Sequence, residues 1–101
     1  MVAINETVDL SCQQLIAAFF KKYPNPRLEV EVNRILKRFM ALKIPMPGKP
    51  GGWAGGIVYA ISSSGVGVPG VLNSELEKAF RVTMGTIYKR AAMIDKLLLT
   101  T

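Results

Sequence analysis

Residues 51–74 constrain the fold more than any other part of the chain, because they contain no charged side chain and are rich in glycine. The segment begins GGWAGGIVYA, with four glycines around Trp53. Such a segment can be a phosphate-binding loop, a helix that spans a membrane, or the buried centre of a small fold. These possibilities imply an enzyme, a membrane protein and a binding module respectively.

The residues next to the glycines do not fit a phosphate-binding loop. A nucleotide-binding loop needs glycines ahead of a Lys and a Ser or Thr, at a turn from a strand to a helix. Here Gly48 and Lys49 are followed by Pro50, and no strand is predicted before them. The glycine spacing of a dinucleotide-binding turn is absent as well.

The same segment is long enough to cross a bilayer, which needs about 20 residues. Its seven glycines, three consecutive serines and Pro69 leave little apolar side chain, and a proline opens backbone groups to lipid. Glycines at four-residue spacing instead let a neighbouring backbone approach a helix closely. We therefore predict no membrane partner and a central, tightly packed helix over residues 51–63. Its buried side chains are expected to be Trp53, Ile57, Ala60 and Ile61.

Apolar side chains at three- and four-residue intervals predict two helices before this segment, since that spacing lines one face of a helix. The first ends before Pro24, and the second spans residues 27–43. The inward side chains of the first are Val8, Cys12, Leu15, Ile16, Phe19, Phe20 and Tyr23. Those of the second are Leu28, Val32, Ile35, Leu36, Phe39 and Met40.

Two further helices are predicted after the segment, which makes the chain all-α with five helices. A short helix over residues 74–80 is expected to be capped by Asn73 or Ser74. A longer one begins after a Thr83 cap and runs to about residue 98. Its inward side chains are Ile87, Ala91, Ile94 and Leu98.

Length and composition predict one cytoplasmic domain over residues 1–101. This length suffices for one hydrophobic core and not for two. Cys12 is the only cysteine, so no internal disulfide points to an oxidising compartment. Glu6 and Asp9 lie where a secretory signal would be basic and apolar.

Residue types that carry catalysis and metal binding are scarce. The chain has no His, which removes the most common general base and metal ligand. Cys12 lies on an apolar stripe, where a buried structural thiol is expected. The seven carboxylates are scattered along polar faces without the pairing that acid–base catalysis needs. We therefore predict that the protein is not an enzyme and has no catalytic residues, cofactor or metal.

The formal charge of +6 makes an acidic partner worth considering. Lys and Arg outnumber Asp and Glu in both halves of the chain, eight to four before residue 51 and five to three after it. Because the excess is spread in this way, charge alone does not choose between nucleic acid and a solvated surface. The second helix carries four cations that form either a solvated surface or a site for an acidic partner. They are Arg27, Arg34, Lys37 and Arg38.

Residues 74–98 have the layout of a helix-turn-helix, in which a second helix enters the major groove of DNA by its N-terminal end. The outward positions of that helix are Met84, Gly85, Thr86, Lys89 and Arg90. An ordinary helical hairpin fits the same pattern. Arg81 stands where many such turns have a left-handed glycine, so a differently shaped turn is expected here.

Residues 49–98, from KPGGWAGGIVYA through ELEKAFRVTMGTIYKR, resemble the last three helices of a cyclin-fold repeat in the core of transcription factor IIB. They also resemble a family of small uncharacterised prokaryotic domains with a WA-GIVYA motif followed by AF-V. The resemblance covers half the chain. It implies a five-helix cyclin-like bundle that ends in a helix-turn-helix and binds double-stranded DNA.

Carried over to this chain, the resemblance implies that Thr83, Met84 and Thr86 face bases and that Lys89 and Arg90 face phosphates. Gly85 has no side chain with which to read a base. The lone cysteine excludes the zinc ribbon that accompanies the factor, so this chain cannot recruit polymerase in that manner. A cyclin-like module that binds a protein of the transcription machinery, and not DNA, is the alternative.

Overall fold

The computed structural model describes residues 4–62 and 67–99, with side chains for 11–62 and 67–97. These residues form five α-helices and no strand, which confirms the all-α prediction. The helices are α1 (Ile4–Lys22), α2 (Pro26–Ala41), α3 (Pro50–Ile61), α4 (Asn73–Phe80) and α5 (Met84–Ile94). A π-helical turn, Asp95–Leu99, continues α5.

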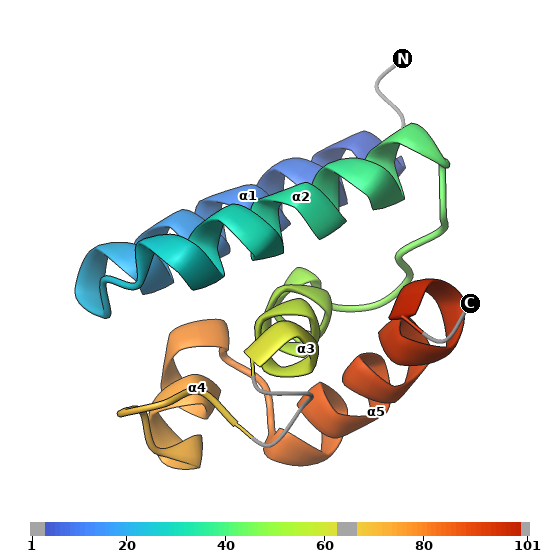
Figure 1. Cartoon of the computed structure of the whole chain (residues 1–101). Coiled ribbons are helices and arrows are strands. Elements are labelled where there is room, and N and C mark those ends of the chain that lie inside the picture. The colour runs from blue at the N-terminus through green and yellow to red at the C-terminus, as the bar shows by residue number, and fades with distance from the viewer. Residues whose placement is uncertain (1–3, 63–66, 100–101) are drawn as a thin grey trace.

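The helices lie in layers, with α3 at the centre (Figure 1). The antiparallel pair α1 and α2 covers one side of α3, and α4 and α5 cover the other. Every residue of α3 from Gly51 to Val58 is buried, as expected of a helix that is apolar on all sides. Within the described residues, no helix is both long and apolar enough to cross a membrane.

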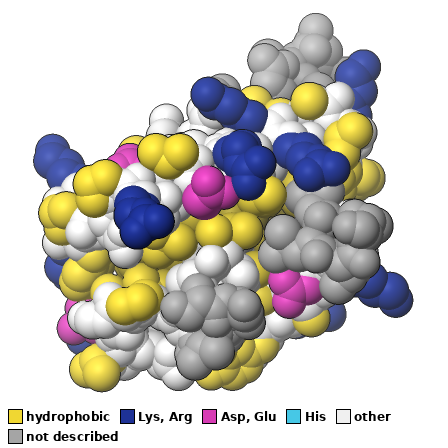
Figure 2. Space-filling model, in the orientation of Figure 1, with side chains coloured by type: hydrophobic (Ala, Val, Ile, Leu, Met, Phe, Trp, Pro, Cys, Tyr) yellow, Lys and Arg dark blue, Asp and Glu magenta, His cyan; other side chains and the backbone are white. Residues whose placement is uncertain are grey.

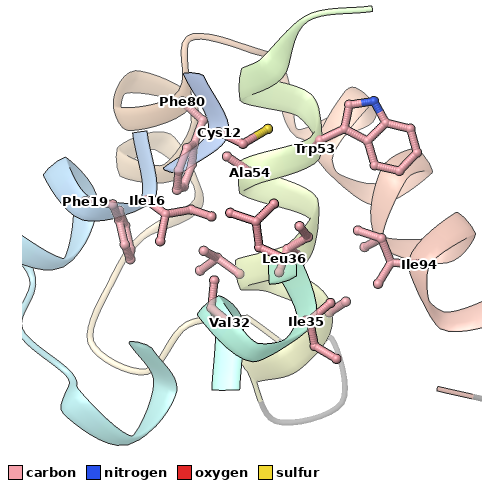
Figure 3. Close-up of a cluster of buried hydrophobic side chains, with 14 of the residues drawn as sticks. Cys12, Ile16, Phe19, Val32, Ile35, Leu36, Trp53, Ala54, Phe80 and Ile94 are labelled. Carbon is pink, nitrogen blue, oxygen red and sulfur yellow. The ribbon is translucent and has the colours of Figure 1, made fainter. Parts of the chain in front are cut away.

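Side chains of α1 and α2 point at α3 and form one core with it (Figure 3). Phe19 of α1 also meets Phe80 of α4, with ring centroids 5.1 Å apart, so the two outer layers touch beside α3. Cys12 is buried, as predicted, and its thiol donates to the carbonyl oxygen of Pro50 at 3.3 Å. Trp53, Ile57 and Ala60 are buried as expected, whereas Ile61 is only half-buried.

The glycines of α3 allow the backbones of α3, α4 and α5 to approach one another. A Cβ atom built at Gly56 would lie 2.7 Å from the Cβ of Arg90, which is closer than such atoms pack. A Cβ at Gly51 would overlap the carbonyl oxygen of Phe80. A Cβ at Gly55 would lie 3.0 to 3.2 Å from side-chain atoms of Ile87 and Phe80, a tighter contact than usual that a small shift of those side chains would relieve. The predicted close packing of this helix is therefore confirmed.

Side chains cap the N-terminal ends of α2 and α5, and the second of these caps was predicted from the sequence. Asn25 caps α2 by accepting from the Leu28 amide at 3.3 Å, and Pro26 then occupies the first turn, where its missing N–H costs nothing. Thr83 caps α5 as predicted, accepting from the Thr86 amide at 3.3 Å.

Other expectations about the helices were wrong. Leu72, without a side-chain hydrogen bond, is the N-cap of α4, because Asn73 is already helical and donates instead to the hydroxyl of Tyr88 at 3.2 Å. The α-helix of α5 ends at Ile94, and a π-helical turn follows. Met40 was expected to be inward and is 36% exposed, since it lies near the end of α2. Val8 and Leu98 lie outside the residues whose side chains are described.

Replacing Gly56 with Ala is expected to lower the free energy of unfolding by about 1 to 3 kcal/mol, because the added methyl overpacks the contact between α3 and α5. Gly85→Ala is the matched control: its nearest neighbour would be Thr83 Oγ1 at 3.7 Å, and Ala is favoured over Gly in a helix by up to about 1 kcal/mol. Urea unfolding followed by circular dichroism measures both variants. Equal midpoints for the two would contradict the packing argument.

Candidate functional site

The end of α4 and the start of α5 meet at a tight connection, residues 81–83. Arg81 has φ 57° and ψ 39°, which is the left-handed conformation. The expectation of a differently shaped turn was therefore wrong, because an arginine takes the conformation that a glycine often supplies. For a residue with a Cβ atom this conformation costs about 1 to 2 kcal/mol.

Two side chains hold the N-terminal end of α5. Besides the Thr83 cap, the Glu77 carboxylate of α4 accepts from the Met84 amide at 2.7 Å. A carboxylate at this end also suits the positive end of the helix dipole. Sequence reasoning missed Glu77 here, because the amide it meets belongs to the next helix and no local pattern links the two.

Three cationic side chains from separate segments line an open depression of about 500 Å³ at this end of α5. Lys49 comes from the segment before α3, Arg81 from the connection and Arg90 from α5. Thr83 and Thr86 line the same depression, and Glu77 is the only carboxylate among the lining residues. We call this group of residues the α5 depression. Among the side chains described, no group of three Cys, Asp or Glu residues could hold a metal ion.

The residues predicted to face bases differ in how accessible they are. Thr83 is exposed and Thr86 is half-exposed, and their hydroxyl oxygens lie 3.3 Å apart. Met84 is half-buried and packs against the core. Gly85 is exposed. The two hydroxyl groups are thus the polar groups that these positions offer to a partner.

The residues predicted to face phosphates point in different directions. Lys89 is exposed on α5. Arg90 is half-buried, with its guanidinium over the Trp53 ring, 4.6 Å from the ring centroid. It donates to the Pro47 carbonyl oxygen at 3.0 Å and contacts the Met93 sulfur at 3.4 Å. Of this pair, only Lys89 is exposed.

The second charged region lies on α2, where Lys and Arg side chains gather on the visible face of the molecule (Figure 2). Arg27, Arg34, Lys37 and Arg38 are exposed, as the sequence predicted. Arg34 pairs with Glu31 at 2.7 Å. We call these four cations the α2 face. Because α3 lies between α2 and α5, the α2 face and the α5 depression are on different sides of the domain.

Sequence reasoning missed Lys49 and Arg81 as members of the same group as Thr83 and Thr86. Lys49 is far from α5 in the chain, and it reaches the α5 depression because the start of α3 packs against the end of α4 at Gly51. Arg81 was noted only for its place in the turn. Neither residue belongs to a motif that could have revealed this proximity.

Replacing Arg81 with Gly is expected to raise the free energy of unfolding by about 1 kcal/mol, because glycine takes the left-handed conformation without a Cβ clash. Arg81→Ala is the matched control, since it removes the same charge and keeps the clash. Denaturant unfolding of both variants separates the two effects. A glycine variant no more stable than the alanine variant would show that the connection is unstrained.

The geometry of the α5 depression is the basis for a functional assignment. No protein-family model, curated protein or solved structure matches the chain. The ligand of this protein therefore has to follow from the side chains that line the depression.

Proposed function

We propose that this domain binds double-stranded DNA through the α5 depression, with α4 and α5 acting as a helix-turn-helix. The observation that supports the proposal is that Lys49 and Arg81 line the same depression as Thr83 and Thr86. Cations and hydroxyl groups together are the side chains that most often contact DNA phosphates. The open shape of the depression suits an extended polyanion.

In this proposal Lys49, Arg81 and Lys89 contact phosphates. These side chains, more than the backbone amides at the start of α5, provide the attraction between the protein and DNA. A free helix N-terminus attracts phosphate through its amides, but the Met84 amide already donates to the Glu77 carboxylate. Glu77 also places a negative charge in the α5 depression. Binding therefore depends on the cations around the depression more than on the end of α5.

Sequence preference among DNA duplexes is expected to be weak. Bases are read in the major groove by side chains that donate and accept hydrogen bonds. Gly85 offers no side chain, and Met84 is half-buried. Thr83 and Thr86 lie within hydrogen-bond distance of each other, which leaves them less capacity for a base edge.

A second candidate function is binding of an acidic protein segment, for which the α2 face is the relevant surface. Val30, 64% exposed, lies on the same helix as the α2 face, and Leu42, 57% exposed, follows its end. A surface of cations with exposed apolar side chains fits an acidic, partly apolar partner. The resemblance to transcription factor IIB makes a protein of the transcription machinery the natural class to test.

A salt-dependent titration with duplex DNA tests the first proposal. Log affinity should fall linearly with log salt, by about 0.9 for each phosphate that the protein neutralises. The double variant Arg81→Gln/Lys89→Gln is expected to reduce this slope by about 1.8, that is 0.9 for each of two contacts. The loss should be similar for duplexes of different sequence, because phosphate contacts do not read bases.

The matched control is Lys37→Gln/Arg38→Gln, which removes two positive charges from the α2 face. This variant should keep the slope of the unaltered protein. The proposal is overturned if the slope of log affinity against log salt falls in this control and stays unchanged in Arg81→Gln/Lys89→Gln. That result would place the DNA contacts on the α2 face. Circular dichroism of each variant shows that it is folded.

A further inference from the structure

We infer that Arg90 is a positioning residue, which holds Lys49 at the α5 depression instead of contacting DNA itself. This inference rests on the proposed function, because the task of Lys49 is to meet a phosphate. It assigns different roles to two cations that line the same depression.

Arg90 and Trp53 both donate hydrogen bonds to the same carbonyl group. The Pro47 carbonyl oxygen accepts from Trp53 Nε1 at 2.8 Å and from Arg90 Nη2 at 3.0 Å. Trp53 is fully buried, so it is a fixed point of the core. Pro47 stands two residues before Lys49, and this double hydrogen bond therefore fixes the backbone that leads to the lysine.

The same side chain also packs along the start of α3. A Cβ at Gly48, where φ is +90°, would lie 2.9 Å from Arg90 Nη2. A Cβ at Gly52 would lie 3.5 Å from the Arg90 Cγ atom. The Gly52 amide donates to the Lys49 carbonyl at 3.1 Å. Arg90 thus contacts the chain on both sides of Lys49.

The guanidinium of Arg90 is committed to these internal contacts. Its face covers the Trp53 ring, and two of its nitrogens contact Pro47 and Met93. Turning toward a phosphate would break the stacking and the hydrogen bond to Pro47. Lysine could not replace it, because an ammonium group lacks the planar fork that stacks on a ring and donates in a fixed direction.

The test measures the salt slope of duplex binding for Lys49→Gln, Arg90→Gln and the double variant. If Arg90 positions Lys49, each single variant loses about 0.9 from the slope and the double variant loses no more than Lys49→Gln alone. If Arg90 contacts a phosphate itself, the double variant loses about 1.8, the sum of two contacts, and the inference is overturned. An Arg90→Gln variant with the slope of the unaltered protein also overturns it.

Arg90→Lys keeps the charge and separates positioning from simple attraction. Positioning predicts that this variant binds as weakly as Arg90→Gln, whereas a direct charge contact predicts binding close to that of the unaltered protein. Trp53 is the only tryptophan, so its fluorescence reports the stacking directly. The emission should shift in both Arg90 variants and stay unchanged in Lys49→Gln.

Trp53→Phe provides a variant in which every charge is retained. It removes the Nε1 hydrogen bond to Pro47 and should also weaken binding, with the same loss of slope as Arg90→Gln. If Arg90→Gln does not fold, Arg90→Lys and Trp53→Phe test the positioning role in its place. The inference is overturned if both bind duplex DNA as the unaltered protein does. An unaltered protein that does not bind duplexes overturns the proposed function as well, whereas additive losses overturn only the role of Arg90.

Discussion

The close approach between the glycine face of α3 and the backbones of α4 and α5 is the contact on which the rest of the structure depends. At Gly51 and Gly56 there is no room for a side chain, so the start of α3 lies directly against Phe80 and Arg90. This approach brings Lys49 to the connection that carries Arg81. The same approach puts the Arg90 guanidinium over Trp53. Core packing and the charge distribution of the α5 depression therefore have one cause.

Polar groups around this contact are satisfied inside the protein, which gives the α5 depression a fixed shape. The Glu77 carboxylate accepts a hydrogen bond from the Met84 amide, and the Thr83 hydroxyl accepts one from the Thr86 amide. The Pro47 carbonyl oxygen accepts two, from Trp53 and Arg90. A fixed site loses less conformational freedom when a ligand binds. Lys49, Arg81 and Lys89 are exposed, and they are the groups that the proposed binding of DNA relies on.

Local signals in the sequence predicted most of the secondary structure. These signals are the apolar stripes of α1 and α2, the end of α1 before Pro24, and the Thr83 cap of α5. Each depends on residues a few positions apart in the chain. Two features that the sequence did not reveal involve a group from another helix. Asn73 is the first residue of α4 and not its cap, and its side-chain amide donates to the Tyr88 hydroxyl of α5. The carboxylate at the start of α5 comes from α4.

By itself, the sequence determined that this chain is an all-α domain with a central glycine-rich helix and a cationic surface on α2, because helical periodicity and charge are properties of short segments. Only the tertiary structure decided which cations share the α5 depression and that Arg90 turns inward. Those facts depend on contacts between residues about 30 to 45 positions apart, such as Pro47 with Arg90. No local pattern encodes such a contact, since its energy comes from packing that exists only when the helices have assembled.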